Sequence, residues 1–82
     1  MKQKSWCVYL LKCLDGSYYT GITNNLNKRL ESHKKGTGSK YVNAKGFDCL
    51  IASKEVLNKS DALKTEYKIK QLSKERKLDF FK

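Results

Sequence analysis

Arg29 and His33 are the first pair of residues whose types and spacing suggest chemistry. They lie four residues apart, so a helix would bring them together on one face. Neighbouring leucines would turn that face toward a core. Each residue also has an ordinary interpretation, because a helix C-terminus favours a charged histidine and a surface arginine commonly pairs with an acid such as Asp48. Taken singly, each residue favours its ordinary interpretation.

Glu66 is a carboxylate on an apolar helix face. On a helical wheel at 100° per residue, Ala62 and Ile69 lie about 20° apart, and Glu66 falls between Ala62 and Leu63. A carboxylate in such a place is costly unless it is paired or holds a metal ion. The two interpretations are therefore an ion pair at the edge of the core and a metal site.

The charge of the chain predicts a polyanionic partner. The 82 residues carry a net charge of +10, and residues 34–46 contain four lysines and no acid. Lysines near phosphates release counterions, which gives affinity without sequence preference. The alternative is an ordinary lysine-rich protein, since lysine outnumbers arginine sixteen to two. Tyrosines near these lysines would either pack in the fold or stack on bases.

Three cysteines, Cys7, Cys13 and Cys49, lie in apolar stretches without the spacing of a zinc site. We expect them to act as small hydrophobic residues in a reducing compartment, which predicts a cytoplasmic protein. No apolar run approaches the roughly 18 residues of a membrane span, so we expect no membrane partner.

The elements that must position these residues can be predicted from apolar alternation, turn residues and helix caps. The strand at residues 6–13 is apolar on both faces, which is typical of a central strand covered on both sides. The last helix should dock Leu78, Phe80 and Phe81 on the core. The predicted elements are strands at 6–13, 18–23 and 47–56, a helix from a cap at 23–25 to Lys35 with Gly36 after it, a short helical turn at 39–42, a helix from Asn58 or Ser60 to about Leu72, and a helix from Ser73 to about Phe81.

The turn between the first two strands determines where two tyrosines point. A two-residue Asp15-Gly16 loop would place Tyr9 and Tyr19 on opposite faces of the sheet. A three-residue loop with Gly16 left-handed pairs Tyr9 with Gly21 and puts both tyrosines on one face. We favour the three-residue loop, because the site described next requires both side chains together.

The ordered combination of these residues resembles the GIY-YIG nuclease superfamily. The first motif is Cys7-Val8-Tyr9, and the second is Tyr19-Thr20-Gly21. The chain is particularly similar to small stand-alone bacterial members of UPF0213 type, which are related to the N-terminal catalytic domain of the repair enzyme UvrC. The later stretch 66–73 is similar to their C-terminal half. The resemblance implies an α+β fold, in which helices flank a three-stranded antiparallel sheet in the order β-β-α-β-α-α, as a single domain over residues 1–82.

The resemblance also implies roles. Tyr19 would be the general base that activates water, Arg29 the phosphate clamp, and Glu66 the ligand of one Mg²⁺ or Mn²⁺ ion. Because a phenol is a poor base at its ordinary pKa near 10, the guanidinium, the metal and hydrogen bonds would have to favour the phenolate.

Two further residues, Tyr9 and His33, would orient Tyr19 or contact the phosphate, and Gly21 would let the backbone approach its neighbours closely. All five side chains of the site must then converge on one face of the sheet. The residues expected to bind nucleic acid are Lys34, Lys35, Lys40, Tyr41 and Lys45.

The predicted function is a metal-dependent endonuclease that cuts DNA phosphodiesters in repair, recombination or nucleic-acid processing. Ile22 stands where UvrC has a basic residue, which leaves fewer groups on the phosphate and implies a weak or partner-dependent activity. A protein partner would then supply specificity. One alternative is a nucleic-acid-binding module with little catalysis. The other is a scaffold with an exposed apolar patch at Phe80 and Phe81.

Overall fold

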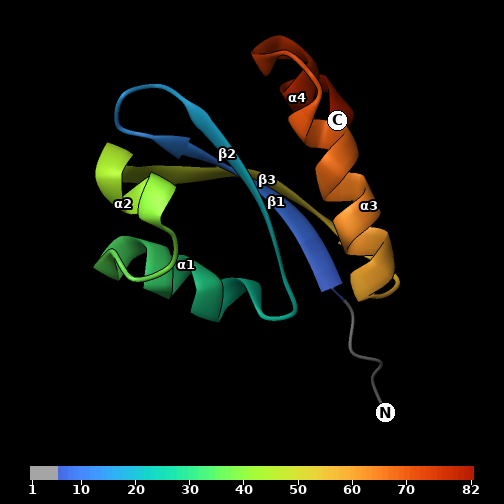
Figure 1. Ribbon diagram of the computed structural model, residues 1–82, viewed down its shortest axis with the longest axis horizontal. Helices are drawn as coiled ribbons and strands as arrows, with labels where there is room; N and C mark the ends of the chain where they lie inside the picture. The colour runs from blue at the N-terminus through green and yellow to red at the C-terminus, as the bar shows by residue number, and fades with distance from the viewer. Residues whose placement is uncertain (1–5) are drawn as a thin grey trace.

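A computed structural model describes residues 6–82, and Figure 1 shows their arrangement. The order of strands and helices confirms the α+β prediction; residues 1–5 of the predicted single domain lie outside the described part. The elements are β1 (Trp6–Cys13), β2 (Tyr18–Thr23), α1 (Leu26–Lys35), α2 (Lys40–Lys45), β3 (Phe47–Val56), α3 (Lys59–Lys70) and α4 (Lys74–Phe80).

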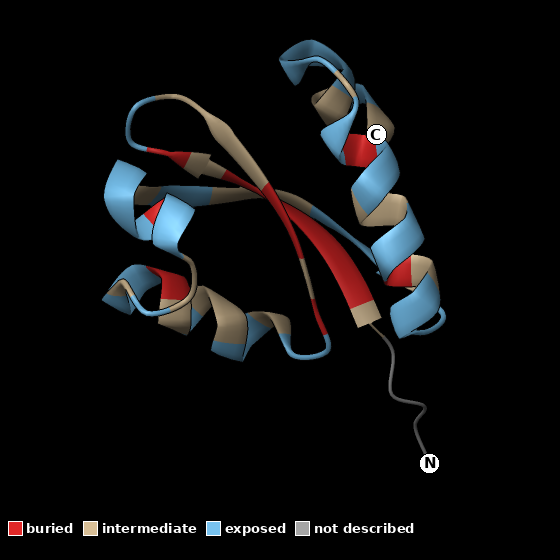
Figure 2. Cartoon of the chain, viewed as in Figure 1, coloured by how far each residue is buried: buried red, intermediate tan, exposed pale blue. Residues whose placement is uncertain are grey.

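The three strands form one antiparallel sheet in the order β2-β1-β3. β1 is therefore central, as its apolar faces predicted, and Figure 2 shows it as the most continuously buried strand. Tyr9, Leu11 and Cys13 pack on the side of α1 and α2, while Val8 packs with Ala62 of α3. Figure 1 shows the same division, with α1 and α2 on one side of the sheet and α3 and α4 on the other.

The turn between β1 and β2 has the predicted three-residue loop. The Cys13 N–H donates to the Ser17 carbonyl at 2.8 Å, and Gly16 is left-handed with φ of 88°. The resulting register places Tyr9 opposite Gly21. Both tyrosines of the motifs consequently share the face that α1 covers.

The helix that carries Arg29 and His33 begins and ends as its sequence predicts. The Asn25 side chain accepts from the Lys28 N–H at 3.1 Å, and the left-handed Gly36 ends the helix with φ of 82°. Leu26 and Leu30 pack on the core, so the face of α1 that carries Arg29 and His33 lies against the sheet.

Some predictions about burial were wrong. Leu63 is 48% exposed, because α3 packs through Ala62 and Ile69 and turns Leu63 away. Cys49 is also exposed, because it lies on the edge strand β3. Phe80 and Phe81 pack against the α3-side core, as expected for the last helix, and both are half-buried.

We predict that the first turn of α3 depends on Asn58 and not on Ser60. The Asn58 Oδ1 accepts from the Asp61 N–H at 2.8 Å. Replacing this cap should lower the free energy of unfolding by about 1 kcal/mol, whereas Ser60 is an exposed residue inside the helix. Urea denaturation of Asn58→Ala and the matched Ser60→Ala would check this, and equal losses in the two variants would contradict it.

Candidate active site

The centre of the candidate site is the hydroxyl of Tyr9. This side chain is fully buried, and its hydroxyl lies 2.9 Å from His33 Nε2 in a hydrogen bond. The Arg29 Nε–H donates to the same oxygen at 3.3 Å. Burial raises the pKa of Tyr9, while Arg29 partly opposes that shift. Tyr9 is therefore a neutral phenol that joins Arg29 and His33 of α1.

The position of Gly21 explains why this arrangement needs a glycine. A Cβ at Gly21 would collide with the Tyr9 hydroxyl and would lie 3.1 Å from a ring carbon of Tyr19. The missing side chain leaves the space that the Tyr9 hydroxyl fills. The predicted close approach at Gly21 is present, and its neighbours are the two motif tyrosines.

Tyr19 belongs to an aromatic cluster on the same face. Its ring centroid lies 6.4 Å from that of Tyr9 and 5.6 Å from that of His33. Tyr19 also stacks on Tyr41 of α2, with ring centroids 5.7 Å apart and an interplanar angle of 27°. Tyr19 is only partly buried, so it is the tyrosine of this pair of motifs that a substrate can reach.

Arg29 carries a cation that no carboxylate neutralises within residues 6–82. The expected ion-pair alternative with Asp48 is absent, since Asp48 pairs with Lys12 at 3.7 Å. The hydrogen bond to Tyr9 is the main cause that raises the pKa of Arg29, and Tyr19 adds to it. The guanidinium is thus held by the Tyr9 phenol and has no carboxylate partner among residues 6–82.

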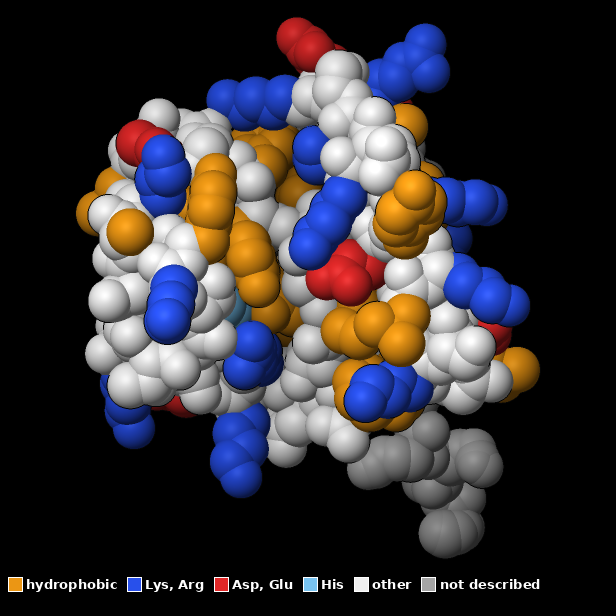
Figure 3. Space-filling view, viewed as in Figure 1, with side chains coloured by type: hydrophobic (Ala, Val, Ile, Leu, Met, Phe, Trp, Pro, Cys, Tyr) orange, Lys and Arg blue, Asp and Glu red, His pale blue; other side chains and the backbone are white. Residues whose placement is uncertain are grey.

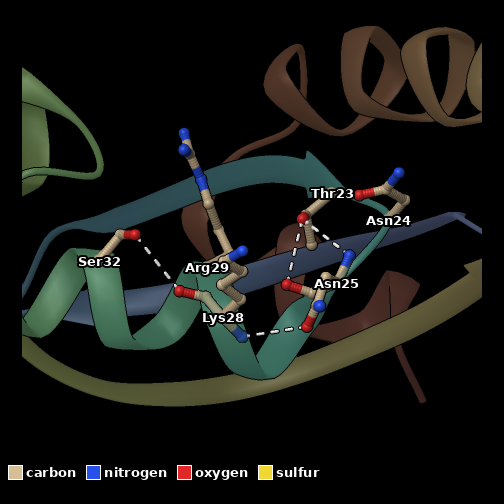
Figure 4. A pocket seen from close by; sticks show the side chains of 6 residues that line it. All are labelled: Thr23, Asn24, Asn25, Lys28, Arg29 and Ser32. Carbon is tan, nitrogen blue, oxygen red and sulfur yellow. Dashed lines mark hydrogen bonds between the residues drawn. The ribbon is translucent and has the colours of Figure 1, made fainter.

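A small cavity lies at the start of α1, beside Arg29. Its volume is about 210 Å³. Figure 4 shows the capping bonds of Asn25 along one side of it, with the Arg29 side chain stretching away from the helix. The residues that line it are Thr23, Asn24, Asn25, Lys28, Arg29 and Ser32. Lys28 was missed as a candidate, although its place one residue before Arg29 in a helix start was visible in the sequence.

His33 is buried at 2% exposure, and its environment favours the neutral imidazole. Desolvation is the main cause that lowers the pKa of His33, and the charge of Arg29 lowers it further. Nε2 meets Tyr9, but Nδ1 has no hydrogen-bond partner among residues 6–82. A Cβ at Gly38 would lie 2.8 Å from that Nδ1, so the backbone at Gly38 covers it closely.

Glu66 lies on a different side from the other four residues. It belongs to α3, which packs on the face of Val8, so the prediction that all five side chains share one sheet face was wrong. α3 contacts β2, the edge strand that carries Tyr19. Figure 3 shows that the molecular surface in this view is hollowed between the side of α1 and α2 and the side of α3. Acidic side-chain atoms are exposed at the border of this hollow toward α3.

The Glu66 carboxylate itself is mostly buried, with 20% of the side chain exposed, and its Oε2 lies 3.3 Å from Lys70 Nζ. The ion pair that the sequence left open is therefore present. Within residues 6–82 no three acidic, histidine or cysteine side chains gather as a metal site. One carboxylate suits Mg²⁺, which commonly takes one or two carboxylates and completes its shell with water and substrate phosphate.

The predicted nucleic-acid-binding residues differ in whether they are paired with a carboxylate. Lys45 pairs with Asp15 at 3.2 Å, and hydrogen bonds from Ser17 mainly lower the pKa of Asp15 to about 2, so this acid stays charged. Lys34 pairs more loosely with Glu31 at 3.9 Å. The remaining members, Lys35, Lys40 and Tyr41, are exposed.

The register of the two motifs and the matches to known proteins agree. A family model described as the GIY-YIG catalytic domain matches residues 5–79. The chain belongs to the GIY-YIG family. This is a nuclease family, which makes nucleic acid the substrate class.

Relatives of this GIY-YIG chain are bacterial UPF0213 proteins. The one from Oceanobacillus iheyensis is 48% identical over 71 residues, covering 87% of this chain and 83% of that protein. The one from Clostridium perfringens is 46% identical, covering 87% and 76%. A solution NMR structure of the UPF0213 protein from Bacillus halodurans matches with a TM-score of 0.57 and 37% identity, over 93% of this chain and 81% of that one.

The helices of residues 6–82 are too short or too polar to cross a membrane.

We predict that His33 titrates below its ordinary pKa of 6.5, because burial and Arg29 oppose its charge. Since the unfolded chain binds a proton at higher pH than the folded chain, this contribution to stability is complete above pH 6.5 and falls as the pH drops below it. The chain has one histidine, so its imidazole resonance in a proton NMR titration is unambiguous. A midpoint at or above 6.5 would contradict the prediction. His33→Gln should flatten the decline of urea stability between pH 7 and pH 5.

Proposed function

We propose that this GIY-YIG chain is a metal-dependent endonuclease that hydrolyses DNA phosphodiester bonds. The observation that carries the proposal is the arrangement of Tyr9, Arg29 and His33 beside the accessible Tyr19. This arrangement holds the Arg29 guanidinium, which has no carboxylate partner in residues 6–82, and the partly exposed phenol of Tyr19 on one side of the hollow in Figure 3. Repair, recombination or related processing in the cytoplasm is the setting that this chemistry suits.

Arg29 would bind the phosphate that is cut. A phosphodiester gains negative charge on its oxygens as water attacks, and a guanidinium can hold two of those oxygens. Its Nε is already committed to Tyr9 at 3.3 Å, which leaves the terminal nitrogens for the substrate. His33 and Tyr9 are positioning residues in this scheme, because they are buried and act on the substrate through Arg29.

Tyr19 would accept the proton of the attacking water as a phenolate. The water oxygen bonds to phosphorus and one of its protons passes to Tyr19. The bond from phosphorus to the leaving oxygen breaks with its electron pair on that oxygen, which then takes a proton from solvent. Glu66 would hold one Mg²⁺ or Mn²⁺ ion, which supplies positive charge at the phosphate when bound. Binding of the ion requires the carboxylate to exchange the Lys70 ammonium for the metal.

The hollow face would track the nucleic-acid backbone. Figure 3 shows Lys and Arg side chains on both sides of it. Lys35 and Lys40 lie exposed on the side of α1 and α2, where they would contribute affinity without reading bases. Target choice would then come from DNA structure or from a protein partner.

A binding module with little catalysis is the second candidate. The ion pair between Glu66 and Lys70 favours it, because a carboxylate satisfied by lysine has less need of a metal. Both candidates predict binding to nucleic acid, and only the first predicts cleavage.

We predict Mg²⁺-dependent cleavage of DNA that is lost in three variants. Tyr19→Phe removes the base and should lower kcat by about 100-fold or more. Arg29→Lys removes the forked donors, and Glu66→Gln removes the negative ligand; each should cost a similar factor. Cleavage of labelled duplex, flap and single-stranded DNA with Mg²⁺ or EDTA measures these rates.

Each variant has a matched control in the same chain. Tyr18→Phe changes the neighbouring tyrosine, which lies under Lys74 on the opposite face. Arg76→Lys and Glu75→Gln change exposed residues of α4. The controls should keep their rates within about twofold. If the wild-type chain binds DNA but cuts none of the three forms, the binding module is the correct function.

A further inference from the structure

We propose that the outward face of Tyr41 is a stacking site for an unpaired nucleobase next to the phosphate that is cut. The inference rests on the proposed function and names its substrate class, a nucleic acid with an unstacked nucleotide at the cleavage position. It is carried by the contacts of Tyr41 with the candidate base and with a lysine.

Tyr41 is placed directly against Tyr19. The two rings stack with centroids 5.7 Å apart at 27°, so one face of Tyr41 is covered by the candidate general base. The residue nevertheless remains 42% exposed. A large aromatic side chain therefore presents surface to solvent beside the reacting group, and Figure 3 shows hydrophobic side chains along this border of the hollow.

Packing of the core does not explain why position 41 is aromatic. The residue that anchors α2 in the core is Val42, at 1% exposure. Tyr41 lies before it on the helix and outside the set of fully buried side chains. An exposed ring that contributes little to the core is available for a ligand.

The helix that presents Tyr41 is fixed at both ends. The Ser39 hydroxyl accepts from the Val42 N–H at 3.4 Å, and the Gly46 N–H donates to the Val42 carbonyl at 2.7 Å. The Leu14 N–H donates to the Gly46 carbonyl at 2.9 Å, which ties α2 to the turn between β1 and β2. The ring is thus presented by a short, anchored helix, so little ordering is needed when a base binds.

A cation accompanies the ring. Lys45 Nζ lies over the ring of Tyr41, 5.6 Å from its centroid, and 3.2 Å from Asp15 Oδ2. A base that stacks on the outward face would move this ammonium off the ring, and the phosphate of that nucleotide would replace Asp15 as its partner. Aromatic stacking with a nearby lysine is how single strands are commonly bound.

The geometry favours an unpaired nucleotide over a base within a duplex. Inside a duplex both faces of each base are covered by neighbouring bases, so a protein ring has nothing to stack on. An unpaired base in a single strand or a flap offers a free face at little cost. Tyr41 would then select substrates by the state of their bases and not by sequence.

The test is equilibrium binding in EDTA, which separates it from cleavage. The probes are a single-stranded oligonucleotide with one 2-aminopurine and the same strand in a duplex. Tyr41→Leu should weaken binding of the single strand by about fivefold or more, abolish the quenching of 2-aminopurine, and change duplex binding by less than twofold. Tyr41→Phe keeps the ring and should bind as the wild type does.

Tyr67→Leu is the matched control, because Tyr67 is an exposed tyrosine of α3 at 69%. It should leave single-strand binding unchanged within twofold. Equal losses for single strand and duplex in Tyr41→Leu, or wild-type binding without quenching, would overturn the stacking site. Absence of cleavage with Mg²⁺ would instead overturn the proposed function, while the binding result in EDTA would still stand by itself.

Discussion

The buried hydroxyl of Tyr9 is the interaction on which the rest of the site depends. It takes a hydrogen bond from Arg29 at 3.3 Å and lies 2.9 Å from His33. A buried phenol must have partners, because an unsatisfied polar group in a core costs about 1 to 3 kcal/mol. The space for this oxygen exists because Gly21 has no side chain. The Tyr9 hydroxyl reaches Arg29 and His33 only when the position of β1, the three-residue loop and the packing of α1 on the sheet are all as observed.

The positively charged side chains fall into those that are paired with a carboxylate or an aromatic ring and those that are not. Lys12, Lys45 and Lys70 each face a carboxylate, and several other lysines lie over aromatic rings, as Lys74 does over Tyr18 at 4.8 Å. Exposed pairs of this kind contribute little stability, but they set where the lysines point. Arg29 differs from them because its hydrogen-bond partner is the Tyr9 phenol, and none of the carboxylates in residues 6–82 pairs with it.

The sheet separates the two sides that carry the residues of the proposed site. Tyr9 of β1, Tyr19 of β2 and the Arg29 and His33 side chains of α1 lie on one side, while α3 carries Glu66 on the other face. β2 is the edge strand between them and is in contact with α3. Because an edge strand has no neighbour on its outer side, groups from both faces can border the same hollow. This placement accounts for a site assembled from elements far apart in the chain.

The sequence alone determined the strands and the helices, and its resemblance to the GIY-YIG family indicated most of the Tyr9 cluster. Alternation, caps and glycines act between near neighbours, so the strand bounds and the end of α1 at Gly36 could be predicted, whereas the loop with Gly16 left-handed followed from the need to place Tyr9 and Tyr19 on one face. The side of the sheet that α3 covers, the exposure of Leu63 and the stacking of Tyr41 on Tyr19 were decided by tertiary structure. The physical reason is that these contacts join segments distant in the chain, and their energy depends on how whole surfaces pack and not on local residue preferences.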